Sequence, residues 1–119
     1  MVLFNQTRQA VLAGRVKTAE GFWVRLAGLL GRPSLPAGEA LVLKRCRAVH
    51  TCFMRFNIDV AFLDEKGRVL KILVNLRPCR FPRPVPGASQ VVELPAGTLL
   101  CTGTLPGDTL VFLEEEGRR

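Results

Sequence analysis

The sequence predicts a mainly β protein, a small antiparallel β-barrel or sandwich with one or two short helices. Glycine and proline interrupt the chain often, with 11 and 8 residues respectively. The segments between them are short and rich in Val, Leu, Ile and Phe, which is typical of strands. With 119 residues the chain can bury about two-thirds of its unfolded surface. No repeat, linker or low-complexity tract divides it, so we expect a single domain over residues 1–119.

The expected strands are apolar runs of strand length that end at Gly, Pro or a turn. In the N-terminal part, residues 2–17 indicate one or two irregular strands around Gly14. The later strands are expected at residues 40–49, 53–64, 68–76, 90–94 and 109–113. Short strands of this kind, with few helices between them, favour an antiparallel barrel or sandwich.

Two segments depart from the strand pattern and are expected to be helical. Within Glu20–Leu30 the apolar residues recur at helical spacing, namely Phe22, Leu26, Leu29 and Leu30. Gly31 can supply the left-handed conformation that commonly ends a helix. A second, shorter helix is expected at Pro95–Thr102, because proline suits the first position of a helix.

Three connecting segments have a structural meaning. Asp64 to Gly67 is expected to form a tight hairpin turn, in which Gly67 takes positive φ without steric cost. Prolines in Pro78–Gly87 lack an N–H group, so this segment is expected to be a long, stiff surface loop. In Gly107-Asp108 the carboxylate is expected to accept backbone N–H bonds and to connect neighbouring loops, which is a role in the fold.

The net charge of +7 is unevenly distributed along the chain. Ten basic and three acidic residues lie between Lys44 and Arg83, a surplus of seven that equals the whole net charge. Such a surface attracts phosphates or acidic partners, although a solvated basic surface without a partner is the simpler interpretation. Tyrosine is absent and there is one tryptophan, so we expect no specific nucleic-acid partner.

The sequence also carries expectations about the cellular compartment. No apolar run approaches the roughly 20 residues that a membrane helix needs, so we expect no membrane partner. The first residues lack the basic segment and apolar core of a secretory signal, and we expect a cytoplasmic protein.

The four cysteines are expected to be unpaired, inert and mostly buried thiols: Cys46, Cys52, Cys79 and Cys101. Cys46, His50 and Cys52 form a Cys-x-x-x-His-x-Cys pattern that invites a metal interpretation. Four residues of extended chain, however, separate Cys46 from His50 by about 13 Å, too far to share one ion unless the chain bends sharply. We therefore expect neither a metal site nor a cofactor.

The segment from His50 to Asp64 holds the only histidine of the chain, with polar and charged residues inside an apolar run. In an extended strand Arg55, Asn57 and Asp59 share one face, opposite a stripe of apolar residues. One interpretation is structural, an Arg55–Asp59 ion pair hydrogen-bonded to a nearby loop. The other is functional, one wall of a polar pocket.

Several segments spread over most of the chain carry a family resemblance: Arg25–Arg32, Cys46 with His50-Thr51, Met54–Asp64, Gly67–Val69, Leu76–Arg80, Glu93–Thr98 and Gly107-Asp108. In this order they are similar to the bacterial and archaeal family catalogued only as domain of unknown function 192. The resemblance implies a small, mostly β domain of barrel or sandwich type, with no assigned reaction. Asn57 stands where the family often has proline. Cys79 stands where it usually has an aromatic residue, often tryptophan, which weakens stacking at any ligand site there.

Three functions follow from these observations. We rank first a non-catalytic binding module for a small anionic or polar ligand, because guanidinium groups match carboxylate, phosphate and sugar oxygens. Its candidate ligand-binding residues, around a shallow polar cleft, are His50, Arg55, Asn57, Asp59 and Arg80. The second is an enzyme in which Asp59 orients His50 as acid or base. The third is a protein-interaction domain that docks an acidic partner through the basic stretch 44–83.

No glycine-rich phosphate loop or serine elbow indicates a named reaction, so the sequence leaves open whether the protein is an enzyme.

Overall fold

The computed structural model describes residues 1–19, 35–49, 51 and 55–114. Its strands are β1 Val2–Asn5, β2 Ala10–Ala13, β3 Arg15–Ala19, β4 Glu39–Lys44, β5 Ile58–Leu63, β6 Val69–Leu76, β7 Gln90–Pro95 and β8 Leu110–Leu113. The helix within the described ranges is α2, Thr98–Thr102. The helix expected at Glu20–Leu30 lies outside the described residues. In the described part of the chain, no helix has the length and apolar character needed to cross a membrane.

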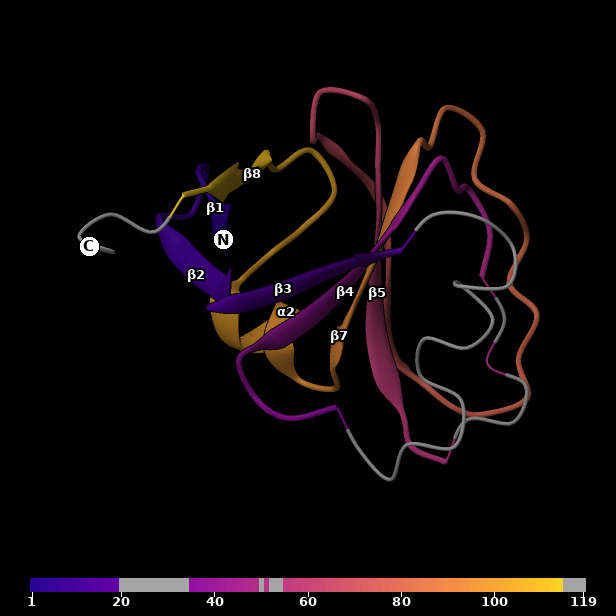
Figure 1. Ribbon diagram of the computed structural model, residues 1–119. Coiled ribbons are helices and arrows are strands. Elements are labelled where there is room, and N and C mark those ends of the chain that lie inside the picture. Colours follow the sequence, from indigo (N-terminus) through magenta and orange to yellow (C-terminus); the bar gives the residue numbers. More distant parts are fainter. Residues whose placement is uncertain (20–34, 50, 52–54, 115–119) are drawn as a thin grey trace.

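The strands form two sheets (Figure 1). The smaller sheet has the order β2-β1-β8, and both of its pairings are antiparallel. The larger sheet has the order β3-β4-β7-β5-β6. Its pairings are antiparallel except for β3 with β4, which run parallel from Arg15 opposite Glu39 to Ala19 opposite Leu43. Only Gly14 separates β2 from β3, so the chain passes directly from one sheet into the other.

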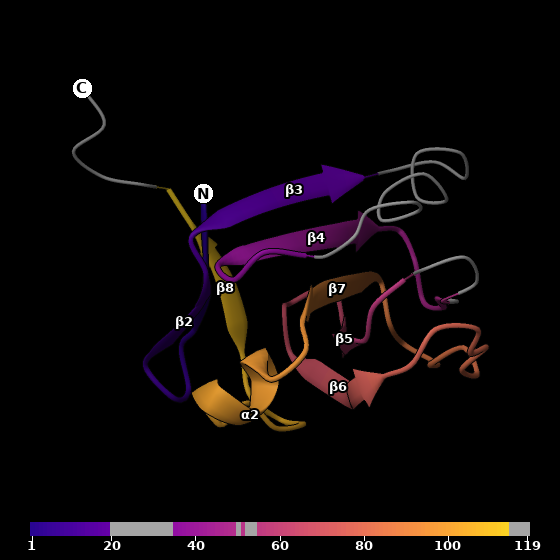
Figure 2. The same cartoon turned by 90° about the horizontal axis from the view of Figure 1, so that it is seen from below.

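The larger sheet lies in the middle of the molecule and has a hydrophobic core on each face. The first core fills the space between the two sheets and α2, with members such as Leu3, Val92 and Leu99. The second core lies on the opposite face, which loops cover on the right of Figure 1, and includes Phe62 and Val85. Figure 2 shows the smaller sheet, the larger sheet and the loops that cover it from below.

Strand β5 illustrates how the sequence produces this arrangement. All six of its residues are buried. A strand with one face in water alternates apolar and polar residues, whereas a strand covered on both faces reads as a continuous apolar run. Ile58, Val60 and Phe62 enter the second core, and Ala61 and Leu63 enter the first.

The prediction of a mainly β protein is confirmed, with differences in detail. Among the described strands the sheets do not close into a barrel. Strands β3 and β4 run parallel, whereas the expectation was of antiparallel strands. The strand expected at 53–64 begins only at Ile58. The second helix begins at Thr98, because Pro95 still belongs to β7.

Two expected connecting segments are confirmed. Gly67 has φ +85°, and its N–H donates to the Asp64 carbonyl at 3.0 Å, closing the β5–β6 turn. The Asp64 carboxylate also accepts the N–H groups of Lys66 and Arg68, each at 2.9 Å. Residues 78–87 contain no strand, as their prolines predict.

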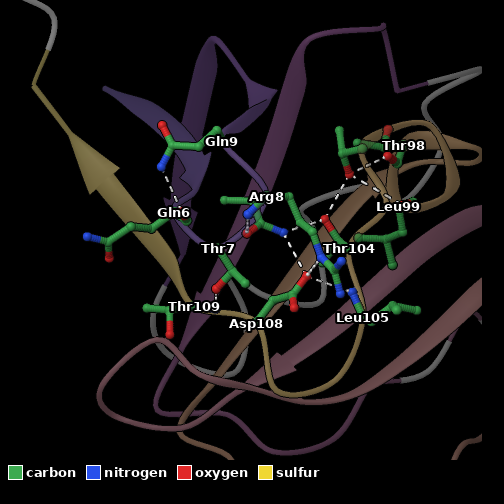
Figure 3. A network of polar contacts seen from close by, with 12 residues as sticks. Gln6, Thr7, Arg8, Gln9, Thr98, Leu99, Thr104, Leu105, Asp108 and Thr109 are labelled. Atoms are coloured by element: carbon green, nitrogen blue, oxygen red, sulfur yellow. Dashed lines mark hydrogen bonds and ion pairs between the residues drawn. The ribbon is translucent and has the colours of Figure 1, made fainter.

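Asp108 has the structural role that the sequence predicts (Figure 3). It is 3 % exposed, and one of its oxygens accepts hydrogen bonds from Leu105 N–H at 3.0 Å, Asn5 Nδ2 at 3.1 Å and Arg8 Nε at 2.9 Å. Burial by itself would raise the pKa of Asp108, but these hydrogen bonds and the Arg8 charge together lower it. Asn5 also donates to the Thr104 hydroxyl at 2.9 Å. The network joins β1 to the segment that precedes β8.

Candidate functional site

Asp59 is fully buried in β5, at 0 % exposed, and faces the core between the two sheets. One carboxylate oxygen accepts the Asn75 N–H at 2.8 Å. The other accepts the N–H groups of Gly97 at 3.1 Å and Leu99 at 2.9 Å. These two donors lie at the start of α2, where a helix leaves N–H groups without intrahelical partners. Asp59 therefore caps this helix from a strand 38 to 40 residues earlier in the chain.

Arg55 and Asn57 precede β5 and do not continue its alternation. Arg55 is exposed, and the ion pairs found among the described residues do not join it to Asp59. Asn57 donates through Nδ2 to Asn75 Oδ1 at 2.9 Å. Asn75 has φ +56° and lies in a bulge of β6, where two residues oppose the single Asp59. The expectation of one shared face is wrong, because residues 55–57 are not part of a strand and Arg55 lies on the surface.

Thr51 organises the segment that contains Arg80. It is 0 % exposed, and its hydroxyl donates to the Arg77 carbonyl at 2.7 Å and accepts the Arg80 N–H at 2.7 Å. Its backbone N–H donates to the Arg80 carbonyl at 3.0 Å, and its carbonyl accepts the Cys79 N–H at 2.9 Å. These bonds hold Cys79 at φ +62°, which side-chain-bearing residues rarely adopt. A lone threonine in an apolar run carries no sequence signal for this role.

Arg80 belongs to a surface built from two loop regions, the described residues 46–49, 51 and 55–57 and residues 77–89, which we call the arginine loops. They run side by side on the outer face of the larger sheet (Figure 1), with further backbone hydrogen bonds from Cys46 to Ser89 at 3.1 Å and from Val85 to Arg47 at 2.9 Å. Together they contain five arginines and no Asp or Glu. All five are exposed: Arg47, Arg55, Arg77, Arg80 and Arg83. The structure thus brings Arg55 and Arg80 onto one loop-covered face, while Asp59 points to the opposite face.

Glu93 is a second buried carboxyl group that the sequence analysis did not single out. It lies in β7, the central strand of the larger sheet, and is 5 % exposed. Its cross-strand neighbours are Leu41 and Val60, which belong to the second core, so its side chain projects under the arginine loops. Burial raises the pKa of Glu93 to about 7. An acidic residue inside the apolar run Val91–Leu94 is the signal that could have identified it.

The thiols differ from expectation in exposure. Cys46, Cys79 and Cys101 are free, but Cys79 and Cys101 are exposed and Cys46 is half-buried. Cys52 and His50 lie outside the described residues, so their expected roles stay predictions. Within the described ranges no cluster of three or more His, Cys, Asp and Glu residues is suited to hold a metal ion.

Two hollows lie beside the β5–β6 turn. The first has a volume of about 620 Å³, and its lining includes Lys44, Arg45 and Glu65. The second has a volume of about 490 Å³ and shares Glu65 and Ser89 with the first. Both mix basic and acidic side chains, and neither is lined by a predicted site residue. Opposite charges in one hollow weaken its attraction for an anion.

With its two sheets and one short helix among the described residues, the chain is a small, mainly β protein. The chain belongs to the family named domain of unknown function 192, described as an uncharacterised ACR, whose model matches residues 3–112. The family resemblance seen in the sequence is therefore confirmed.

The chain is similar to proteins from archaea and bacteria. A UPF0127 protein of Thermococcus sibiricus is 34% identical over 121 residues, covering 98% of this chain and 78% of its own. A UPF0127 protein of Pyrococcus furiosus is 35% identical over 111 residues, covering 91% of this chain and 95% of its own. The crystal structure of a protein of unknown function from Novosphingobium aromaticivorans matches with a TM-score of 0.80 at 23% identity, over 93% of this chain and 83% of that one. This last likeness supports the fold.

Proposed function

We propose that the protein is a non-catalytic binding module that takes a small anionic or polar ligand, such as a carboxylate, phosphate or sugar, on the face covered by the arginine loops. One observation carries the proposal. Five exposed arginines come from two loops that are hydrogen-bonded to each other and contain no acidic residue. Of the predicted ligand-binding residues, Arg55, Asn57 and Arg80 belong to these loops, whereas Asp59 points to the opposite face and holds Asn75 and the start of α2.

The chemistry of these loops favours an anion over other ligands. A guanidinium group presents rigidly arranged N–H donors that match the oxygens of carboxylate and phosphate. No side chain within the loops offers an internal carboxylate to neutralise these groups, so a bound anion would relieve their mutual repulsion. Thr51 holds the backbone at Arg77 and at Arg80, which lowers the ordering cost of binding.

The other two functions are less well supported. Catalysis by His50 with Asp59 needs a carboxylate that can orient the imidazole, but backbone N–H groups occupy both oxygens of Asp59. Docking of an acidic protein partner would use the same arginines as a small anion. The size of the ligand therefore separates these two proposals.

Isothermal titration calorimetry with inorganic phosphate and citrate tests the proposal. The wild-type chain is compared with the double variant Arg77→Ala/Arg80→Ala and with Arg68→Ala, which removes an exposed arginine beside the β5–β6 turn. Hydrogen bonds to charged groups contribute about 1.5–3 kcal/mol each, so the double variant should bind at least about tenfold more weakly. Arg68→Ala should bind like the wild type. Equal affinity in all three chains would refute an arginine-loop site. Binding of a glutamate-rich peptide without binding of either small anion would assign the face to a protein partner instead.

A further inference from the structure

The larger hollow beside the β5–β6 turn continues the inner face of the larger sheet beyond the first core. On β3, β4 and β7 this face carries three valines that belong to the core or pack against it: Val16, Val42 and Val92. Side chains two positions apart on a strand share a face, so three polar residues follow on the same side: Thr18, Lys44 and Gln90. All three line the hollow. The inner face therefore changes from apolar to polar where the hollow begins.

The smaller sheet and the β5–β6 turn supply the remaining walls that matter for binding. Phe112 of β8 packs against the first core and also lines the hollow. Glu114, two residues further along the chain, and Glu65 of the turn line it as well. The volume of about 620 Å³ falls within the range of roughly 300–1,000 Å³ that is typical of small-molecule sites. Such sites combine apolar surface with a few polar groups, as this hollow does.

The charged side chains around the hollow are balanced in sign. Its lining contains two basic residues, Lys44 and Arg45, and two acidic residues, Glu65 and Glu114. The ion pairs found among the described residues include none of Lys44, Glu65 and Glu114. A purely anionic ligand would be repelled by the carboxylates, and a purely cationic ligand by the basic side chains. A ligand that carries both charges can interact favourably with both.

We propose that this hollow is a second binding site, which takes a small zwitterion with an apolar side chain, such as an aliphatic amino acid. Lys44 binds the carboxylate of the ligand, assisted by the amide of Gln90, its cross-strand neighbour. Glu65 and Glu114 bind the ammonium group, and the apolar side chain packs on Phe112. The site shares no residue with the face covered by the arginine loops, so its test is independent of the proposed function.

Titration of the ¹⁵N-labelled full chain with leucine, followed by nuclear magnetic resonance, tests this inference. Leucine should cause saturable shifts at the backbone amides of Thr18, Gln90 and Phe112. Isocaproate lacks the ammonium group of leucine, and isoamylamine lacks its carboxylate. Each should bind at least about tenfold more weakly than leucine, because an interaction with a charged group is lost. Glycine, which has no apolar side chain to bury, should likewise bind at least about tenfold more weakly.

Three variants assign the contacts to particular side chains. In Lys44→Gln, leucine should bind at least about tenfold more weakly, whereas isoamylamine should lose no affinity. In Glu65→Gln/Glu114→Gln, leucine should again bind more weakly, whereas isocaproate should lose no affinity. Lys17→Gln is the matched control, since it removes the same charge from β3 on the face that it shares with Ala19 of the second core. It should bind leucine like the wild type.

Three results would overturn the inference. The first is a leucine titration without saturable shifts at the three amides. The second is isocaproate that binds as tightly as leucine, which would make the hollow a site for anions. The third is a leucine affinity that does not change in Lys44→Gln. Weaker leucine binding in Lys44→Gln and in Glu65→Gln/Glu114→Gln, with Lys17→Gln unaffected, is the result that supports the inference.

Discussion

At the residue scale, Asp59 shows how a charged residue inside an apolar run can serve the fold. Its two oxygens satisfy backbone donors in the β6 bulge and at the start of α2, and these donors come from segments far apart in the sequence. The alternation of Arg55, Asn57 and Asp59 predicts a shared face only if the chain is extended throughout. The sequence cannot reveal that the strand begins at Ile58, because that boundary depends on a bulge and a helix elsewhere in the chain.

Replacing Asp59 should therefore affect stability independently of Arg55. Asp59→Ala leaves three N–H groups without an acceptor, and we expect a loss of about 2–4 kcal/mol in the free energy of unfolding. Arg55→Ala, at an exposed position, should change it by less than about 0.5 kcal/mol. A double-mutant cycle by urea denaturation should show additive effects. A coupling energy above about 1 kcal/mol would restore the ion-pair interpretation.

Glu93 makes a pH-dependent contribution whose sign follows from its raised pKa. The folded chain binds a proton with a pKa of about 7, whereas the ordinary value is 4.5. The wild type therefore loses stability as the pH rises from about 4.5 to 7, because the folded state holds a proton that the unfolded state releases. Glu93→Gln cannot titrate, so the variant should exceed the wild type in stability at pH 8 by on the order of 2–3 kcal/mol. The difference should shrink towards zero near pH 4.5.

Urea denaturation of both chains at pH 5, 6, 7 and 8 measures this difference directly. Glu65→Gln is a matched control, because it removes an exposed carboxylate and relieves no buried charge. It should change stability by less than about 0.5 kcal/mol at pH 8. A stability gain in Glu93→Gln that does not change with pH would show that the Glu93 carboxyl group does not titrate in this range.

At the element scale, the elements joined by short turns were the most predictable. The β5–β6 hairpin could be predicted because Asp64 to Gly67 carries its own turn chemistry, and the proline loop because its residues exclude a strand. The parallel β3–β4 pair could not be predicted, since local sequence does not specify which distant strand is the partner. The position of Thr51 beside Arg77 and Arg80 is a long-range contact of the same kind.

The β5–β6 turn should be sensitive to any side chain at Gly67. This residue has φ +85°, and a Cβ atom there would collide with the Leu110 carbonyl oxygen. Gly38 has a similar φ of +86° but open space around it. Gly38→Ala should therefore cost about 1 kcal/mol, from conformation alone, whereas Gly67→Ala should cost at least about 1 kcal/mol more. Thermal denaturation of the two variants compares them. Equal losses would mean that the turn moves away from Leu110 without cost.

At the scale of the whole molecule, the composition predicted the class of fold but not its layering. Gly and Pro punctuation and short apolar runs are enough to predict a mainly β chain. The central sheet has a core on both faces, so its strands lack the clean alternation that would assign each side chain to one face. The candidate site could be predicted only in part. The surplus of basic residues between Lys44 and Arg83 was visible in the sequence, whereas the separation of Arg55 and Arg80 from Asp59 depends on the tertiary structure.

The net charge of +7 also sets an expectation for nucleic acids. Exposed arginines attract phosphates of any sequence, and the arginine loops carry few aromatic residues that could stack on bases. If about five phosphates are contacted, affinity should fall roughly 500-fold between 50 mM and 200 mM salt. Fluorescence anisotropy with two duplexes of unrelated sequence should give equal affinities. A sequence-dependent complex that persists at 200 mM salt would contradict this expectation.

The most direct test of the central claim is to map anion binding onto the chain by nuclear magnetic resonance. Uniformly ¹⁵N-labelled protein is titrated with inorganic phosphate at low ionic strength, and the shift of each backbone amide is followed. An anion held by the arginine loops should produce its largest shifts at Thr51 and across residues 77–83, with small shifts at the β5–β6 turn. Shifts concentrated at Thr18, Glu65 and Gln90 would place the site in the hollow beside the β5–β6 turn. Either that result or a spectrum without phosphate-dependent shifts would contradict the proposed function.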